Sequence, residues 1–206
     1  KQQLSLNLLQ QQVNPHFLYN TLDNICALAE LDEKETLIQL VMNLSSFYRS
    51  SLSNGKMHIS IGQELEISRA YLEILQIRYF HKFDFTITCP EALKNYSCIK
   101  LLLQPILENS IYHGIKGLDR HGILHIEAED AGDCIRFTIS DNGRGFSKED
   151  YEKIWQRDAN HFGIKSIQQR ILLYYGPGYG LSMESPQTGG CITVITLPKQ
   201  EGLPCH

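Results

Sequence analysis

Residues 123–145 read ILHIEAEDAGDCIRFTISDNGRG, and this stretch decides the fold. Ile123–Glu129 and Ile135–Ser140 have the composition of strands, and the turn residues Asp130–Asp133 lie between them. Asp141–Gly145 follows directly as a short polar loop that contains two glycines. The stretch therefore predicts two strands of a sheet with a glycine-containing loop at the end of the second.

Helical patterns lie on both sides of these strands. Ser60 with Gln63 three positions later is a capping-box pattern, which predicts the start of a helix. Hydrophobic periodicity predicts helices over residues 60–80, 99–111 and 164–175, and further strands over 83–89, 181–185 and 192–197. This order predicts the α+β fold class, with an α/β sandwich that has helices on one face of a mixed sheet.

The N-terminal part of the chain has the pattern of a helical hairpin. Two apolar stripes lie on either side of a charged turn at 32–35, and the second of them runs from Leu37 to Tyr48. Because such a hairpin cannot bury its own apolar face, we expect a homodimer joined through a four-helix bundle. The predicted domains are the hairpin, 1–56, and a second domain, 57–206, with a linker over 53–62. The first apolar stripe has alternating steps of four and three and runs through Leu4, Leu8, Gln11, Pro15, Leu18, Leu22, Ile25 and Ala29.

Composition excludes several classes of protein. The net charge is −4 and no run is rich in Lys or Arg, which argues against nucleic acid as the main partner. The six cysteines form no C-x-x-C pair, so neither a zinc site nor a disulfide framework is predicted. His121 and His125 have metal-like spacing, but residues four apart on a strand are roughly 13 Å from each other.

Three motifs carry candidate chemistry, and the first is Asn14-Pro15-His16-Phe17-Leu18-Tyr19-Asn20. Proline removes a backbone donor and loosens a helix directly before the histidine. His16 lies one position off the apolar seam, so its ring can reach solvent. A neutral imidazole is a competent nucleophile near neutral pH.

The second motif is residues 103–114, LQPILENSIYHG. Its apolar stripe anchors a helix in the core, while Glu108, Asn109 and His113 project from other faces. Asn109 and His113 are one turn apart and share a side of the helix. An amide oxygen suits a hard cation such as Mg²⁺, which makes Asn109 a candidate metal ligand.

The third motif is the loop Asp141–Gly145. An aspartate at a strand end can accept a hydrogen bond from an exocyclic amine, and Gly143 and Gly145 let the backbone approach a ligand closely. A strand-ending turn is the alternative, since Asp-Asn-Gly is also good turn chemistry. Neither a Walker-type phosphate loop nor a G-x-G-x-x-G after a strand is present.

The order N-P-H-F-L-Y-N, E-N-S-I-Y-H-G and D-N-G-R-G-F resembles the LytS/YesM-type branch of bacterial sensor histidine kinases, across nearly the whole chain. These kinases share the ATP-binding sandwich of gyrase, Hsp90 and MutL, the GHKL type. The resemblance implies that His16 is the phosphoacceptor and that Asn109 binds Mg²⁺. It also implies that Asp141 binds the adenine amine, with Gly143 and Gly145 shaping the same wall of the site.

Further residues follow from the same resemblance. His113 is assigned to the nucleotide site, Gly163 matches the second glycine of the family's later G-x-G-L motif, and Phe146–Phe162 corresponds to the ATP lid. Tyr112 replaces a common basic residue, which leaves Lys116, Lys165 or Arg170 to supply positive charge for the phosphates. Other departures are His161 in place of the first glycine of G-x-G-L, Pro105 in place of a water-activating glutamate, and Phe17 in place of an acidic residue, which leaves Glu108 as one candidate base.

The implied function is autophosphorylation of His16 with ATP and Mg²⁺, followed by phosphoryl transfer to an aspartate of a response regulator. The first alternative is a pseudokinase that binds ATP and uses the hairpin as a dimerisation scaffold, supported by His161 and Tyr112. The second is an ATP-driven clamp, against which Pro105 and the His16 hairpin both argue. The chain starts without Met and contains no apolar run of about 20 residues. We expect the cytoplasmic portion of an integral membrane sensor, attached to the membrane only through a region absent from this chain.

Overall fold

The structure is a computed structural model that describes residues 15–52, 57–155 and 162–201. The helices are α2 (Pro15–Glu30), α3 (Lys34–Ser51), α4 (Ile61–Arg78), η2 (Glu91–Leu93), α5 (Gln104–Asn109), η3 (Ser110–Ile115), α6 (Lys148–Trp155) and α7 (Phe162–Tyr175). The strands are β1 (His58–Ser60), β2 (Phe83–Thr88), β3 (Ser97–Ile99), β4 (Gly122–Asp130), β5 (Cys134–Asp141), β6 (Gly180–Glu184) and β7 (Cys191–Pro198).

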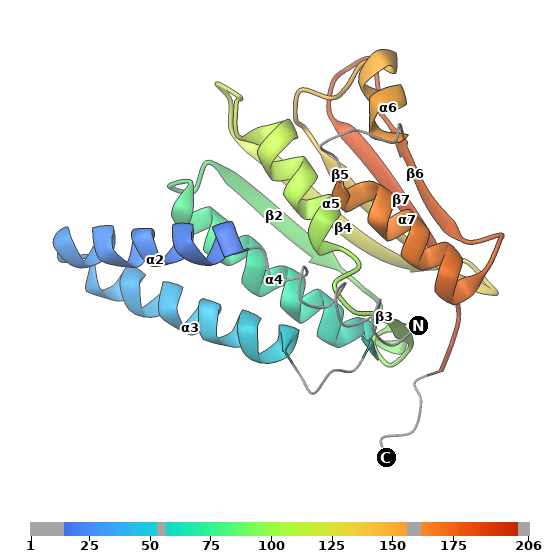
Figure 1. The fold of residues 1–206 in the computed structure, drawn as a ribbon, viewed down its shortest axis with the longest axis horizontal. Helices are drawn as coiled ribbons and strands as arrows, with labels where there is room; N and C mark the ends of the chain where they lie inside the picture. Colours follow the sequence, from blue (N-terminus) through green and yellow to red (C-terminus); the bar gives the residue numbers. More distant parts are fainter. Residues whose placement is uncertain (1–14, 53–56, 156–161, 202–206) are drawn as a thin grey trace.

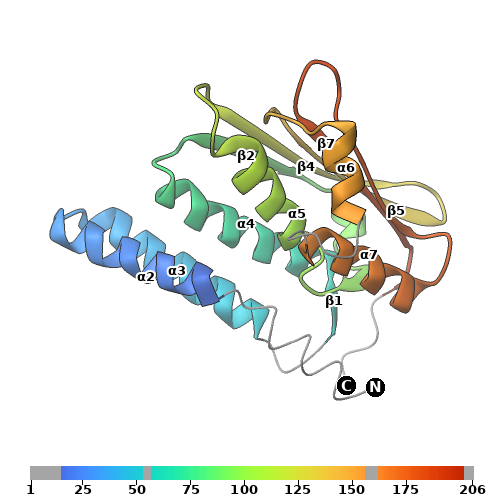
Figure 2. The ribbon, with the colours of Figure 1, turned by 45° about the horizontal axis from the view of Figure 1, so that its top comes forward.

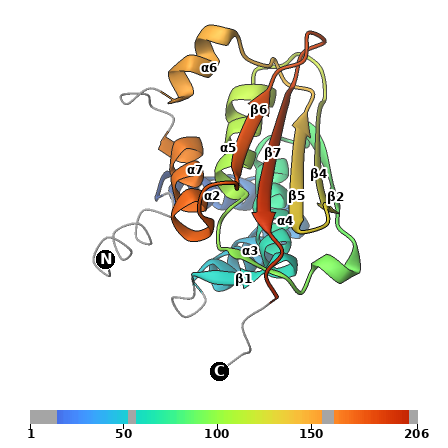
Figure 3. The ribbon, with the colours of Figure 1, turned by 90° about the vertical axis from the view of Figure 1, so that its right-hand side faces the viewer.

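A five-stranded mixed sheet forms the centre of the fold, in the order β2-β4-β5-β7-β6. β2 pairs with β4 in parallel and the other neighbours are antiparallel. Residues of β4 alternate between buried and exposed, as expected when only one face of a sheet is covered. Figure 3 shows α4, α5 and α7 on that covered face. The predicted α+β sandwich is confirmed.

α2 and α3 form the predicted hairpin, and they lie along the side of α4 that faces away from the sheet (Figures 1 and 2). Phe17 of α2 and Phe47 of α3 are buried, and their ring centroids lie 4.9 and 5.8 Å from that of Tyr71 on α4. The hairpin therefore shares one hydrophobic core with the sandwich. The expectation that it buries no apolar face within its own chain is corrected here, because α4 covers one side of it.

A second side of the hairpin stays exposed and apolar. Leu22 and Val41 are 44% and 42% exposed, and Ile38 and Met42 are exposed further. Leu4, Leu8 and Gln11 of the predicted seam lie outside the described residues. None of the described helices is both long and apolar enough to cross a membrane.

The start of α4 follows the sequence prediction closely. The Ser60 hydroxyl accepts a hydrogen bond from the Gln63 backbone N–H at 3.1 Å, and the Gln63 side chain accepts one from the Ser60 N–H at 3.1 Å. β1 precedes this cap inside the segment predicted as a linker, and it pairs with β3.

Two other elements differ from the prediction. The helix expected from Ile99 begins only at Gln104, because residues 97–99 are held as β3 and Leu101 has a φ of +54°. A left-handed residue cannot continue a right-handed helix. The segment assigned to the lid, for which no helix was predicted, contains α6.

Candidate functional site

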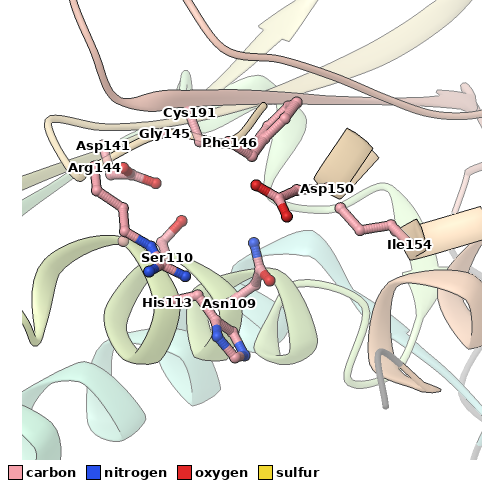
Figure 4. A pocket seen from close by; sticks show the side chains of 11 residues that line it. Asn109, Ser110, His113, Asp141, Arg144, Gly145, Phe146, Asp150, Ile154 and Cys191 are labelled. Atoms are coloured by element: carbon pink, nitrogen blue, oxygen red, sulfur yellow. The ribbon is translucent and has the colours of Figure 1, made fainter. Parts of the chain in front are cut away.

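A pocket opens where the end of β5 meets the helical segment formed by α5 and η3 (Figure 4). It is a partly open pocket, and the 540 Å³ of space within it includes solvent at its mouth. Its lining residues come from α5 and η3, the loop after β5, α6 and β7. They are Asn109, Ser110, His113, Gly114, Asp141, Arg144, Gly145, Phe146, Asp150, Ile154 and Cys191.

Asp141 is the buried acid of this pocket. It is 9% exposed, and its Oδ1 accepts a hydrogen bond from the Gly143 N–H at 2.8 Å. Burial raises the pKa of Asp141, while the Ser110 hydroxyl and the backbone N–H groups of Gly143 and Cys191 oppose that shift. The second carboxylate oxygen, Oδ2, is buried without a well-formed hydrogen bond in the described part of the chain. Such an oxygen is suited to a ligand that donates a hydrogen bond.

The glycines of the third motif are required by close packing. A Cβ on Gly143 would lie 2.6 Å from both Asp141 Oδ1 and the Gly114 Cα, so a side chain there would collide with the carboxylate and with η3. Gly145 has a φ of +70°, a region that favours glycine. The loop is also tied to η3, since the Arg144 N–H donates to the Gly114 carbonyl at 3.1 Å. Both glycines therefore allow the loop to pack closely beside Asp141.

The second motif ends in a π-helical turn. α5 is α-helical through Asn109, and η3 continues it from Ser110 to Ile115. Local π-helical geometry is frequent at functional sites. The turn brings Asn109, Ser110 and His113 to the pocket together, and Figure 4 shows the Asn109 and Asp150 side chains facing each other across the cavity.

The lid supplies pocket residues that the sequence prediction did not single out. Ser147 Oγ accepts a hydrogen bond from the Asp150 N–H at 3.1 Å, and Asp150 Oδ2 accepts one from the Ser147 N–H at 3.2 Å. This pair caps α6, and its S-x-x-D pattern was a readable signal. Phe146 stacks on Tyr151 at 5.8 Å. Residues 156–161, with His161 among them, lie outside the described residues.

Six predicted site residues are not among those that line the pocket: Gly143, which packs directly against Asp141, then His16 and Glu108, and three residues of α7. His16 is exposed on α2, and its Nδ1 lies 3.0 Å from the side-chain nitrogen of Asn20. Glu108 accepts a hydrogen bond from Gln104 at 3.0 Å. Burial raises the pKa of Glu108, while Gln104 and Tyr71 of α4 oppose the shift. Glu108 thus lies on the α4 side of α5, although its neighbour Asn109 faces the pocket.

The other three, Gly163, Lys165 and Arg170, are on α7. Gly163 packs against α5, since a Cβ there would lie 3.2 Å from that of Pro105. Lys165 Nζ donates to the Trp155 carbonyl at 3.4 Å. Arg170 is 7% exposed and donates to the backbone carbonyls of Lys100 and Leu101. In the structure described, Arg170 does not line the pocket, and its guanidinium is directed to these two carbonyls.

The remaining polar residues singled out from the sequence, Tyr112, Lys116, His121 and His125, contact other residues of the protein. The Tyr112 hydroxyl accepts a hydrogen bond from Arg78 at 3.2 Å, and Lys116 lies 6.0 Å from the Tyr112 ring. His121 pairs with Asp84 at 3.0 Å, and His125 lies 2.6 Å from the Thr86 hydroxyl. Over the described ranges, no three His, Cys, Asp or Glu side chains are grouped to hold a metal ion. Any ion at Asn109 would therefore share its coordination with a ligand.

Comparison with protein families matches two regions of the chain. Residues 4–83 match the family described as histidine kinase. Residues 96–201 match the family described as histidine kinase-, DNA gyrase B- and HSP90-like ATPase.

Individual proteins similar to this chain are sensor histidine kinases. The chain is 34% identical over 193 residues to sensor histidine kinase YesM of Bacillus subtilis, covering 94% of this chain and 33% of YesM. It is 33% identical over 181 residues to sensor histidine kinase BtsS of Escherichia coli, covering 88% of this chain and 31% of BtsS. The chain thus spans about a third of the length of these relatives.

A solved structure supports the fold. Histidine kinase ThkA, crystallised with the response regulator protein TrrA, superposes with a TM-score of 0.54 at 15% identity. The match covers 96% of this chain and 61% of that one.

Proposed function

Because the chain belongs to the LytS/YesM-type sensor histidine kinases, within the GHKL family of ATPases, we propose that it transfers the γ-phosphoryl group of ATP to His16. The site of nucleotide binding is the pocket beside Asp141. We further propose that the phosphoryl group passes to an aspartate of a response regulator, and that the chain is the cytoplasmic portion of a membrane sensor. The complex of ThkA with a response regulator supports the partner assignment.

The observation that carries nucleotide binding is the unpartnered Oδ2 of Asp141. A buried carboxylate oxygen without a hydrogen bond favours a ligand with an amine donor, which adenine has and guanine lacks at the same ring position. Gly143 and Gly145 let the loop pack closely against Asp141 and its neighbours, which fixes the carboxylate at the wall of the pocket. These residues fit adenine.

Asn109 is the residue we assign to Mg²⁺. Its side chain faces the cavity from α5, and a neutral amide oxygen is a suitable ligand for an ion that keeps water and phosphate oxygens in its shell. When bound, Mg²⁺ supplies neutralisation of the charge that develops on the phosphates. The role of Asn109 is to hold the triphosphate end of the nucleotide beside the lid.

Substitution of Asn109 by Asp is expected to lower the affinity for ATP about 10- to 100-fold in Mg²⁺, because an added negative charge changes the coordination balance of the ion. Adenosine, which has no phosphates, should bind the variant as it binds the wild type. Calorimetry with both ligands makes the comparison. Equal losses for ATP and adenosine would contradict the assignment of Asn109 to the metal.

The transfer itself needs a ring nitrogen of His16 as nucleophile. The bond from this nitrogen to the γ-phosphorus forms as the bond from phosphorus to the β,γ-bridging oxygen breaks, and ADP leaves with that electron pair. The Asn20 side-chain nitrogen, which can only donate, lies 3.0 Å from Nδ1, so this contact goes with the tautomer that carries the ring proton on Nε2. Attack by Nε2 therefore requires that the proton move to Nδ1 and that the Asn20 contact be released. Figure 1 shows α2 apart from α6, which supplies Asp150 and Ile154 to the pocket, so transfer requires that α2 and a pocket approach each other.

We propose that the chain dimerises through the exposed side of the hairpin. Replacing Leu22 and Val41 together by Asp should give monomers in light scattering, because two charges per chain would be buried in the bundle. Both side chains are partly exposed in the single chain, so its own fold should be retained. The matched control is Leu173 of α7, which is 73% exposed. Leu173→Asp should stay dimeric, and a double variant that also stays dimeric would rule out this face.

A further inference from the structure

Glu64 and Arg170 are buried charged residues that do not line the pocket, yet both bind the same short segment, Lys100–Leu103. Glu64 is on α4 and is fully buried, at 0% exposed. Arg170 is on α7, the helix that follows the lid. The segment between them leads directly into α5, which carries Asn109. A buried acid and a buried base from two different helices thus meet at the start of the helix that faces the nucleotide.

Glu64 binds the amide side of the segment. Its two carboxylate oxygens accept hydrogen bonds from the N–H groups of Leu101 at 2.8 Å and Leu103 at 2.9 Å. Burial raises the pKa of Glu64, and these amides together with the Arg170 charge oppose the shift. Leu103 is the N-cap residue of α5. The carboxylate therefore satisfies amides at the point where α5 begins, which no side chain of α5 itself does.

Arg170 binds the carbonyl side of the same segment. Its Nη1 donates to the Leu101 carbonyl at 3.2 Å and its Nη2 to the Lys100 carbonyl. The residue between these contacts, Leu101, has a φ of +54°, a conformation that is unfavourable for a leucine. Because Glu64 and Arg170 bind the donors and acceptors around this residue, they hold the segment in a conformation that its own sequence disfavours.

The segment determines where α5 starts, and α5 with η3 presents Asn109, Ser110 and His113 to the pocket. α7 also touches α5 directly through Gly163 and Pro105. We propose that Glu64 and Arg170 are positioning residues for the magnesium end of the nucleotide site, acting through the Lys100–Leu103 segment. This rests on the proposed function of the pocket. It also gives Arg170 a role in place of the direct phosphate contact that the sequence suggested.

The test compares Arg170→Lys and Glu64→Gln with the wild type. Lysine keeps the charge but has one ammonium in place of a planar fork that reaches two carbonyls. Glutamine keeps the shape of Glu64 but offers one acceptor oxygen in place of two. Each variant is expected to lose about 10- to 100-fold in affinity for ATP with Mg²⁺, as for supporting residues of metal sites. Adenosine affinity should change less than about twofold. The proposed contact to its adenine amine comes from Asp141, which is on β5 and not on the Lys100–Leu103 segment or α5. In the absence of nucleotide, hydrogen exchange at the Leu101 and Leu103 amides should be faster in both variants than in the wild type.

The matched control is Ile135→Ala, a buried residue at the end of β5 remote from Asp141. It should lower the melting temperature while ATP affinity, measured well below that temperature, stays at the wild-type value. Equal effects of Ile135→Ala and Arg170→Lys on ATP affinity would overturn the proposal. Wild-type ATP affinity in both Arg170→Lys and Glu64→Gln would also overturn it. A wild-type protein that binds no ATP would instead refute the proposed function, and faster amide exchange in the variants would then report structure alone.

Discussion

Replacing Asp141 by Asn is expected to weaken ATP binding by about 1.5–3 kcal/mol, roughly ten- to a hundredfold, the usual contribution of a hydrogen bond to a charged group. The asparagine can keep the bond from the Gly143 N–H through its oxygen, which leaves its NH₂ in the place of the unpartnered Oδ2. That NH₂ would then face the adenine amine, donor against donor. The loss should therefore come from the ligand contact and leave the loop intact.

Calorimetry with ATP and GTP on three proteins measures this effect. The wild type should prefer ATP, and Asp141→Asn should lose that preference. Asp133→Asn, in the exposed turn between β4 and β5, makes the same chemical change away from the pocket and should bind as the wild type does. An Asp141→Asn protein with normal ATP affinity would show that the carboxylate does not bind adenine.

Local pattern was sufficient to predict the sheet and the start of α4. The strand-like composition of 123–129 and 135–140 and the Ser60–Gln63 cap are properties of neighbouring residues, and the structure forms both. The helix at 99–111 was predicted too early because Leu101 is held left-handed by Glu64, 37 residues away, and by Arg170, 69 residues away. No local pattern contains such contacts.

The same distinction applies to the pocket. Asn109, His113, Asp141 and Gly145 were found from sequence because each belongs to a short motif at the end of an element. Cys191 joins them only because β7 pairs with β5, and its register sets it opposite Asp141. Arg170 shows the converse case: its position in the helix after the lid made it one of three candidates for phosphate charge, while in the structure its buried guanidinium donates to two backbone carbonyls.

The second large effect concerns His16. Replacing it by Gln should abolish phosphorylation of the protein, because glutamine has no nucleophilic ring nitrogen. ATP affinity should stay at the wild-type value, since His16 does not line the pocket. His125→Gln, an exposed histidine of β4, is the matched control and should be phosphorylated as the wild type is. This combination separates loss of the acceptor from loss of nucleotide binding.

Incubation of the wild type and His16→Gln with γ-labelled ATP and Mg²⁺ tests the central claim most directly. A phosphoryl group on a histidine nitrogen is a phosphoramidate, which acid hydrolyses and base does not, whereas a phosphoserine ester has the opposite behaviour. We expect label on the wild type that is lost in acid and kept in base, and none on His16→Gln. Label that survives acid, or equal labelling of His16→Gln, would contradict the assignment of this chain as a kinase that phosphorylates His16.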